Sequence, residues 1–384
     1  MKSKLADICD FAKEKTDVSG LDEECYISTE NMMPNKGGIT KATSLPSTVQ
    51  TQAFSAEDTL VSNIRPYFRK IWYAQSDGGC SNDVLVFRHK KDVHPRFLYY
   101  ILADDAFFDY ATATSKGTKM PRGDKQAIMN YPVPNISWNE QCKIADILSS
   151  IDEKIEINVA INKNLEEQAQ AIFKSWFVEY NPWNGNVPAL WIKGNLGDFV
   201  NIKRGGSPRP IQEYLSESGF RWLKISDVTS LQSPFVIDIK DHIIEEGLRK
   251  TVHLKKGSLV LSNSATPGIP KILDVDSCIH DGWLFFPESR FSKEYLYLYF
   301  KYIRQQLVNL SNGSVFNNLK TDILKAYPTI LPDKETLLHF DSVVNPMFLQ
   351  MQNLTRESNR LATLRDILLP RLMSGEIDVS NIEV

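Results

Sequence analysis

Hydrophobic residues recur at alternating four- and three-residue spacing along two long stretches of the chain, the pattern of a helix that packs along one seam. The first stretch runs from Ile144 to Trp176 and contains neither glycine nor proline. The second starts 196 residues later, at Phe340, and reaches Leu372. Two seams of equal length predict a coiled coil between two helices of the same molecule. At 1.5 Å per residue, a helix over residues 138–178 would span about 60 Å and hold two domains apart.

Two asparagines interrupt the first seam. Asn158 and Asn162 stand in line with its apolar residues. An antiparallel pairing that sets Ile144 beside Leu372 would place Asn158 opposite Ser358 in the second helix. A polar layer in a coiled coil lowers stability but fixes register and orientation, so we interpret the asparagines as register markers. The alternative is that the amides occupy a partly solvated seam without such a role.

The second helix fits the pattern less well than the first. Pro346 lies near its start and removes a backbone donor, and Arg365 places a charge in its seam. The sequence therefore predicts weaker pairing along this helix.

The segments outside the two helices repeat one pattern. The matches, in order, are LADICDF (5–11) with LGDFVNI (196–202), LVSN (60–63) with VLSN (260–263), Cys80 and Asp83 with Cys278 and Asp281, FLYYIL (97–102) with YLYLYF (295–300), Gly117 with Gly313, and Tyr131-Pro132 with Tyr327-Pro328. Each match is short, but their common order indicates a duplicated unit of about half the chain.

Each repeat is predicted to form a domain of mixed secondary structure. Short runs such as VLVFR, WLKIS and WLFF have the composition of strands, and Gly, Pro, Asn and Ser punctuate them. A short helix is expected at HPRFLYYILADD (94–105), and the prolines of YPVPNIS and YPTILPD end the two domains. Ser137 and Glu140 then have the spacing of a capping box for the first long helix.

The fold class expected is α+β, with two globular α/β domains related by an internal repeat. Two long helices forming an antiparallel coiled coil would separate them. The predicted boundaries are a first domain over residues 1–137, a central helix over 138–180, a second domain over 181–332 and a C-terminal helix over 333–384.

The composition, 42% hydrophobic and 24% charged, is that of a soluble globular protein. No apolar run approaches the roughly 18 residues of a membrane span, and the N-terminal segment lacks the apolar core of a secretory signal. The five cysteines are scattered and odd in number, which indicates reduced thiols in the cytoplasm. The formal net charge of −3 is unevenly spread: residues 138–180 carry 4 basic and 8 acidic residues, whereas residues 181–332 carry 18 and 14. Because a phosphate backbone responds to local charge, the total does not exclude nucleic acid.

Motifs that supply catalysis are missing from the sequence. There is no GxxxxGK[ST] phosphate loop, and NPW at 181–183, the string nearest to an amino-methyltransferase motif, lacks the second proline. The DEK string at 152–154 falls on the first long helix, not on the strand edge that a nuclease would use. The six histidines form no metal-ligand spacing, and Ser262-Asn263 and His280-Asp281 are better explained as structural polar groups. We therefore predict a binding protein with no catalytic residues and no metal site.

Loops of the first repeat offer basic and hydrogen-bonding side chains in NIRPYFRKIWY (63–73) and SKGTKMPRGDK (115–125). Gly117 and Gly123 would let backbone amides approach a phosphate closely. Arg and Lys suit phosphate contacts, whereas Asn, Ser and Thr suit base edges. An ordinary solvated loop is the alternative for any one residue. The predicted DNA-binding residues here are Arg65, Tyr67, Arg69, Lys70, Lys116, Thr118, Lys119 and Arg122.

The second repeat has similar loops in NIKRGGSPRP (201–210), SNSATPGIPK (262–271) and NGSVFNNLK (312–320). The last is rich in Asn, which can pair in bidentate fashion with adenine. Recurrence at equivalent places in both repeats favours contact with double-stranded DNA over chance. The predicted DNA-binding residues of this repeat are Lys203, Arg204, Asn263, Thr266, Lys271, Asn312, Ser314, Asn317, Asn318 and Lys320.

The first long helix resembles a known family. Residues 140–180, EQCKIADILSSIDEKIEINVAINKNLEEQAQAIFKSWFVEY, are similar to the central conserved helix of the specificity subunit of type I restriction–modification enzymes. The match includes the EQ-x-KI-x-x-x-L start, the ID-x-KIE-x-N centre and the AIFKSWF end. LRDILLPRLMSGEI (364–377) resembles the second conserved region of the family, although the second helix lacks the AIFKSWF string. NIRPYFRKI and GTKMPRGD resemble strings of its recognition domains.

The resemblance implies a DNA-recognition subunit that performs no catalysis itself. Two target recognition domains would each bind half of a split DNA site, at a distance set by the helices. Two methyltransferase subunits would bind the chain and methylate adenines at N6, with up to two motor–nuclease subunits joining them. S-adenosylmethionine, ATP and magnesium would belong to those partners. Ile172, Trp176 and Phe177 are implied as partner-binding residues, with plain coiled-coil core as the alternative for Trp176.

Two other functions stay open at this point. A stand-alone DNA-binding regulator would share the architecture but have no methyltransferase partner, and a neighbouring methyltransferase gene would argue against it. A structural coiled-coil linker whose end domains bind proteins would not bind duplex DNA with a steep salt dependence.

Overall fold

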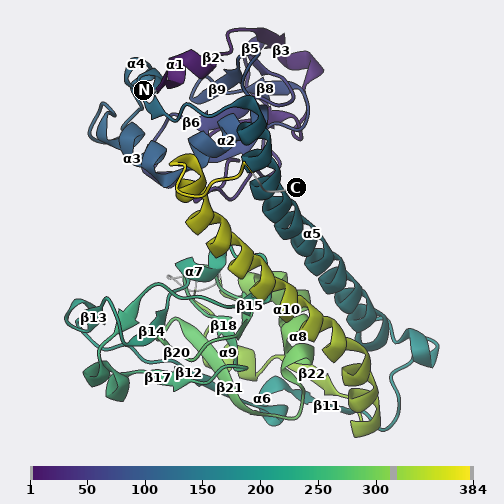
Figure 1. Ribbon diagram of the computed structural model, residues 1–384. Coiled ribbons are helices and arrows are strands. Elements are labelled where there is room, and N and C mark those ends of the chain that lie inside the picture. The colour runs from purple at the N-terminus through teal and green to yellow at the C-terminus, as the bar shows by residue number, and fades with distance from the viewer. Residues whose placement is uncertain (1–2, 312–317, 381–384) are drawn as a thin grey trace. The chain divides into compact units, whose positions relative to one another are not determined.

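The computed structural model describes residues 3–311 and 318–380 (Figure 1). The chain forms two compact units, and each is described by itself. Unit 1 comprises residues 1–154 and 360–384, and unit 2 comprises residues 155–359. The long helices α5 (Trp138–Phe177) and α10 (Lys334–Met373) each contribute one portion to each unit. The units thus divide the chain within the helices, whereas the predicted domains divide it at the helix ends.

The described residues of unit 1 form three small sheets. One has the order β2 (Cys9–Phe11), β9 (Val84–His89), β6 (Thr59–Ser62) and β7 (Ile71–Tyr73). The second has the order β3 (Lys15–Asp17), β5 (Gln50–Phe54), β8 (Gly78–Cys80) and β4 (Tyr26–Ile27). The third pairs β1 (Ser3–Lys4) with β10 (Pro132–Val133). Short helices connect them: α1 (Leu5–Ile8), η1 (Val18–Gly20), η2 (Pro66–Phe68), α2 (Pro95–Ala103), α3 (Asp105–Ala113) and α4 (Lys125–Met129).

The helix predicted at residues 94–105 is α2, and its ends have local causes. Pro95 occupies the first helical position, where a missing N–H costs nothing. Asp104 ends α2 in extended conformation and caps α3, accepting a hydrogen bond from the N–H of Ala106 at 2.9 Å. Phe97 of α2 and Phe87 of β9 belong to one buried core, so the helices cover the first sheet of the unit.

Unit 2 repeats and enlarges this arrangement. Its first sheet has the order β12 (Val200–Arg204), β21 (Trp283–Ser289), β18 (Leu259–Ser262), β19 (Pro270–Leu273) and β15 (Phe235–Val236). The second has the order β13 (Leu215–Ser216), β16 (His242–Ile243), β14 (Phe220–Leu223), β20 (Ser277–Ile279) and β17 (Val252–Leu254), and β11 (Ile192–Asn195) pairs with β22 (Pro328–Leu331). The shorter helices are η3 (Asn181–Trp183), α6 (Leu196–Phe199), η4 (Ile211–Glu213), α7 (Ser226–Thr229), η5 (Glu245–Lys250), α8 (Lys293–Ser311) and α9 (Thr321–Lys325).

The strand order confirms the predicted duplication and the α+β class. The order β2-β9-β6-β7 in unit 1 corresponds to β12-β21-β18-β19 in unit 2. In the second sheets, β4 runs parallel to β8 as β14 runs parallel to β20, and β5 and β17 flank those strands antiparallel. The two units differ in their helices. Unit 2 has the single helix α8 at the position where unit 1 has two helices, α2 and α3, separated at Asp104.

The two long helices pair antiparallel within each unit. In unit 1, Ile144 and Leu372 share one buried core, as the predicted register requires. In unit 2, Nδ2 of Asn158 donates to Glu357, the neighbour of Ser358, at 2.8 Å. Nδ2 of Asn162 donates to Oγ1 of Thr355 at 3.2 Å. The asparagines therefore form polar contacts across the seam, and the antiparallel pairing and its register are confirmed.

Helix α5 begins with the predicted capping box, and helix α10 is continuous. The N–H of Ser137 donates to Oε2 of Glu140 at 3.1 Å, and the N–H of Glu140 donates to the Ser137 hydroxyl at 3.4 Å, which is the predicted capping box of α5. Helix α10 continues through Pro346 without a break. Among the described residues, no helix is both long and apolar enough to cross a membrane.

Candidate nucleic-acid interface

In unit 1, residues 116–122 form a loop that the backbone closes. The N–H of Lys116 donates to the carbonyl of Arg122, and the N–H of Arg122 donates to the carbonyl of Lys116, both at 2.9 Å. Gly117 has a φ of +99°, which only glycine adopts without strain. The side chains of Thr118 and Lys119 at the tip are exposed. The loop therefore presents the predicted contact residues to solvent.

A second segment lies against this loop. The N–H of Arg65 donates to the carbonyl of Pro121 at 2.8 Å, which joins the two segments. Arg65 has a φ of +50° and its guanidinium lies 6.0 Å from the ring of Phe68. Tyr67 is 49% exposed and Phe68 39% exposed, which is high for aromatic residues. Exposed rings beside a guanidinium suit stacking on bases or sugars.

Two other predicted residues of this segment bind the protein itself. The guanidinium of Arg69 contacts Asp105 at 2.8 Å and Asp109 at 3.4 Å, both on α3. The ammonium of Lys70 donates to the carbonyl of Thr29 at 2.5 Å, and burial lowers the pKa of Lys70. Arg69 therefore attaches the segment to α3, and the Lys70 ammonium is bound to the backbone.

Arg122 meets a carboxylate at the turn between β8 and β9. Nη2 of Arg122 lies 3.0 Å from Oδ1 of Asp83, and the two side chains are 55% and 36% exposed. Asn63 connects this turn to the loop, because its N–H donates to the Asp83 carbonyl at 2.8 Å and its carbonyl accepts from Gly123 at 3.1 Å. A Cβ at position 123 would lie 2.8 Å from the buried Oδ1 of Asn63, so the junction requires glycine.

Unit 2 places Asp281 at the corresponding turn between β20 and β21. Its Oδ1 accepts a hydrogen bond from the Ser207 hydroxyl at 2.6 Å, and its Oδ2 accepts one from Nη2 of Arg209 at 3.0 Å. Nε of Arg204 donates to the Asp281 carbonyl. The Ser207 hydrogen bond is the main cause that lowers the pKa of Asp281; burial opposes it, and Arg204 and Arg209 add to it.

Asn263 occupies the position of Asn63 in the second repeat. Its N–H donates to the Gly282 carbonyl at 2.9 Å, and its carbonyl accepts from the N–H of Leu319 at 2.7 Å. Its Nδ2 donates to the Asp281 carbonyl at 3.3 Å. In both repeats a buried asparagine at the end of a strand thus contacts two other segments. One is a turn that carries a carboxylate, and the other is the loop that precedes α4 in unit 1 or α9 in unit 2.

Two predicted contact residues, Lys271 and Asn263, are buried, and a third, Lys70, donates to a backbone carbonyl. Lys271 is 4% exposed, and its ammonium donates to the carbonyls of Leu231 and Ser233 at 2.6 and 2.5 Å. Burial lowers the pKa of Lys271 to about 8. Asn263 is 3% exposed, and Lys70 is bound to the backbone. These side chains hold the protein together and are not among the proposed DNA contacts.

The other predicted residues of unit 2 lie at or near the surface. Lys203 at the end of β12 and Lys320 before α9 are exposed, and Thr266 and Asn318 are partly exposed. Asn312, Ser314 and Asn317 lie outside the described residues. In the described parts of the chain, no group of three or more His, Cys, Asp or Glu side chains is placed to hold a metal ion.

The predicted partner-binding residues lie in the unit 2 portion of α5. Ile172 and Trp176 are partly exposed. The ring of Trp176 lies 5.0 Å from His339 and 5.8 Å from Phe340 of α10. Phe177 is 9% exposed and packs against Phe340, with ring centroids 4.9 Å apart. Phe177 is therefore mainly core, whereas Ile172 and Trp176 keep accessible surface.

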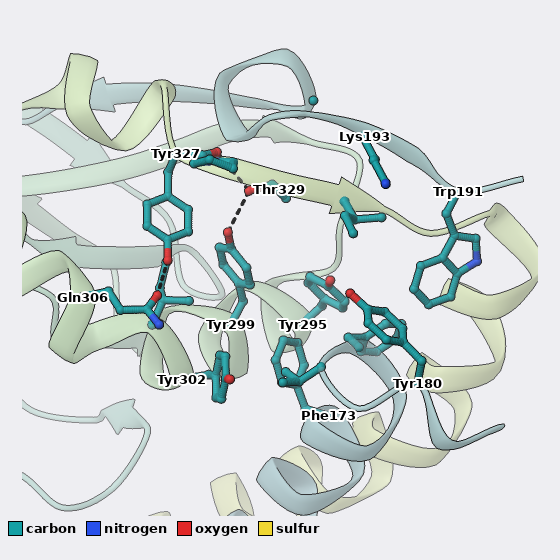
Figure 2. A pocket seen from close by; sticks show the side chains of 16 residues that line it. Phe173, Tyr180, Trp191, Lys193, Tyr295, Tyr299, Tyr302, Gln306, Tyr327 and Thr329 are labelled. Atoms are coloured by element: carbon teal, nitrogen blue, oxygen red, sulfur yellow. Dashed lines mark hydrogen bonds between the residues drawn. The ribbon is translucent and has the colours of Figure 1, made fainter. Parts of the chain in front are cut away.

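Phe177 also borders a pocket of about 450 Å³ in unit 2. Figure 2 shows aromatic rings gathered around it, with Trp191 at one side and Tyr327 hydrogen-bonded to Gln306 at the other. The hydroxyl of Tyr299 meets the hydroxyl of Thr329 at 2.7 Å. The pocket is apolar and aromatic, and it lies beside the helix segment that carries Ile172 and Trp176.

The carboxylates and Arg209 are not among the site residues that the sequence predicts. The available signal was the match between Asp83 and Asp281, which hold equivalent positions in the two repeats. Arg209 lies within a stretch that was singled out, NIKRGGSPRP. Which side chain of that stretch meets a carboxylate depends on contacts across 72 residues, and no local pattern shows it.

A chain that repeats one α+β unit, with arginines held beside a carboxylate on the loops of each copy, has the organisation of a two-part DNA-binding protein. A family model described as the type I restriction modification DNA specificity domain matches residues 1–167 and 188–342. The chain therefore belongs to the type I restriction–modification DNA specificity family, and the resemblance of its central helix to that family is confirmed.

Individual relatives agree with this assignment. The specificity subunit of the type I restriction enzyme HindI from Haemophilus influenzae is 23% identical, over 97% of this chain and 98% of that protein. The MjaIX specificity subunit from Methanocaldococcus jannaschii is also 23% identical, over 76% of this chain and 71% of that protein. The crystal structure of a type I restriction–modification S subunit from M. genitalium is 16% identical, with a TM-score of 0.58 over 97% of this chain and 96% of that one. That structure has the same fold.

Proposed function

We propose that this chain selects the DNA sequence on which a type I restriction–modification enzyme acts, and that each repeat binds one half of a two-part target. The observation that carries the proposal is the recurrence, in both repeats, of a loop cluster in which an exposed arginine lies beside a carboxylate and a buried asparagine. A protein with two such clusters can bind two separate DNA segments, one with each domain.

The proposed DNA contacts are the predicted residues whose side chains reach the surface. Lysines and arginines would bind phosphates and place the protein on the duplex, while arginine, threonine and asparagine side chains would contact base edges. In unit 1 these are Arg65, Tyr67, Lys116, Thr118, Lys119 and Arg122. In unit 2 they are Lys203, Arg204, Thr266, Asn318 and Lys320.

The chain would act through partner enzymes and perform no catalysis itself. Two methyltransferase subunits would bind it and place N6-methyl groups on adenines, and up to two motor–nuclease subunits would join the assembly. Ile172 and Trp176 on α5 are the proposed contacts for a methyltransferase subunit, because both keep accessible surface. S-adenosylmethionine, ATP and magnesium would be bound by the partners. The assembly would work in the cytoplasm.

The test is the adenine methylome of the source strain with and without this gene, recorded by single-molecule sequencing. The proposal expects one two-part N6-methyladenine motif to vanish on deletion and to return when the gene is restored. Loss of no motif, together with sequence-specific binding of the purified chain to duplex DNA, would identify a stand-alone regulator instead.

A further inference from the structure

The carboxylate of Asp281 holds two side chains that come from one distant loop. Ser207 and Arg209 lie 74 and 72 residues earlier in the chain, and each donates to a different oxygen of Asp281. Arg204, the last residue of β12 before this loop, donates to the Asp281 backbone carbonyl. The loop can approach this closely because residue 205 is glycine, and a Cβ there would lie 2.2 Å from the His280 carbonyl oxygen.

The same carboxylate position in unit 1 holds an arginine of different origin. Asp83 contacts Arg122, which follows it by 39 residues, whereas Arg209 precedes Asp281. Duplication of the fold accounts for the two carboxylates, which stand at equivalent turns. It does not account for the two arginines, which come from unrelated loops. The two repeats therefore place an exposed arginine beside this carboxylate through different loops.

The pairs are built to orient a guanidinium, and they contribute little to stability. Asp83 and Asp281 are each 36% exposed, and Arg122 and Arg209 are 55% and 78% exposed. Ion pairs at such exposure add little to the stability of a fold. An arginine side chain has five N–H donors in a fixed plane, so one bond to the carboxylate leaves the remaining donors directed to solvent.

We propose that Asp83 and Asp281 are positioning residues that determine specificity, each fixing the arginine with which its repeat contacts a base. This inference rests on the proposed function. The paired acceptors that suit a guanidinium in the major groove are O6 and N7 of guanine. Each carboxylate therefore sets the preference for a G·C pair in the half-site bound by its own repeat, Asp83 through Arg122 and Asp281 through Arg209.

The experiment replaces the chromosomal gene by Asp83→Asn and by Asp281→Asn and records the adenine methylome of each strain. Asparagine keeps the shape of the side chain and removes its charge. The matched controls are Asp77→Asn and Asp276→Asn, because these aspartates precede β8 and β20 while Asp83 and Asp281 follow them. Thermal unfolding of the purified chains checks that all four variants fold.

The expected result is reciprocal between the two half-sites. Asp83→Asn raises methylation at sites with a mismatch at one G·C position of one half-site, on the order of tenfold, and leaves the other half-site and the gap unchanged. Asp281→Asn does the same in the other half-site, and the controls leave both unchanged. Arg122→Lys relaxes the same position as Asp83→Asn, and combining the two changes adds nothing further.

The inference is overturned if both half-sites keep their preferences in folded Asp83→Asn and Asp281→Asn proteins. It is also overturned if methylation falls equally at all sites, because that pattern identifies a phosphate contact or a purely structural role. If the unaltered gene directs no motif at all, the proposed function fails, and this outcome is distinct from a motif that the variants leave unchanged.

Discussion

Asp152 of α5 and Arg365 of α10 form an ion pair between the two long helices within unit 1, with 2.7 Å between Oδ1 and Nη1. Their side chains are 15% and 19% exposed, and the hydroxyl of Tyr100 donates to the other oxygen of Asp152 at 2.8 Å. Burial alone would lower the pKa of Arg365, but the charge and hydrogen bond of Asp152 raise it above its ordinary value. Arg365, the charged residue that interrupts the apolar seam of α10, is therefore paired with a carboxylate of the facing helix. This ion pair compensates for the weaker pairing that the sequence predicts at Arg365.

Removing one member of this pair should destabilise unit 1. Asp152→Ala leaves the Arg365 guanidinium with only the half-exposed Asp366 as a partner. We expect the free energy of unfolding to fall by about 3 kcal/mol in urea titrations. Asp152→Ala combined with Arg365→Met should recover part of the loss, because no buried charge is then left unpaired. Arg371→Gln, which breaks the exposed pair with Glu376, is the control and should change stability by less than about 1 kcal/mol. An equal loss of unfolding free energy in Asp152→Ala and in the control would show that the buried pair stabilises the protein no more than the exposed pair.

Lys119 and Lys70 should differ in their effect on DNA binding, although both belong to the basic loops of unit 1. Lys119→Ala removes an exposed ammonium, so the slope of log affinity against log salt concentration should fall by about 0.9. Lys70→Ala should leave this slope unchanged, because its ammonium is bound to the carbonyl of Thr29. Fluorescence anisotropy with a duplex that carries the methylated motif, measured at several salt concentrations, checks both. A reversed order of the two effects would contradict the proposed interface.

Lys271 predicts a pH dependence of stability. Its pKa is about 8 in the folded chain, against an ordinary value of 10.5, because burial disfavours the charged form. Between these two pH values the unfolded chain binds more protons than the folded chain, so this group makes stability rise as pH increases. Relative to Lys271→Met, the free energy of unfolding of the unaltered protein should increase by about 3 kcal/mol from pH 8 to pH 10.5. Urea titrations of both proteins across this range provide the comparison, and a constant difference would be the contrary result.

The length of the helix pair should set the gap between half-sites. Inserting one heptad within residues 153–167 of α5 and one within the facing residues 349–363 of α10 preserves the seam while lengthening both helices. The methylome should then show an altered gap and the same two half-sites. An insertion of equal length at Gly185, where a side chain would meet open space, should change neither. Altered half-sites in the heptad variant would show that the helices do not act as a spacer.

The sequence by itself determined the long helices, because the spacing of residues along a helix decides which side chains share a face. In an α-helix each residue follows its neighbour by a fixed rotation, so the seam from Ile144 to Trp176 defined the packed face of α5. The same rule aligned Ile144 with Leu372 and brought Asn158 to the Ser358 level of α10, as the contact with Glu357 confirms. The duplication was also visible, because the repeated strings keep their order along the chain.

Only the tertiary structure decided which polar residues of the loops face solvent. The sequence predicted the same role, a DNA contact, for Lys70, Lys119 and Lys271. In the structure Lys70 donates to a nearby carbonyl and Lys119 is exposed, whereas Lys271 is buried and donates to two carbonyls. Likewise, Asp281 meets Ser207 and Arg209 across more than 70 residues. The direction of a loop side chain depends on the segments that fold against it, and these are distant in sequence. The periodicity of the sequence therefore predicts the packed faces of the helices. The arrangement of the proposed DNA contacts depends on how the loops pack in the folded domain.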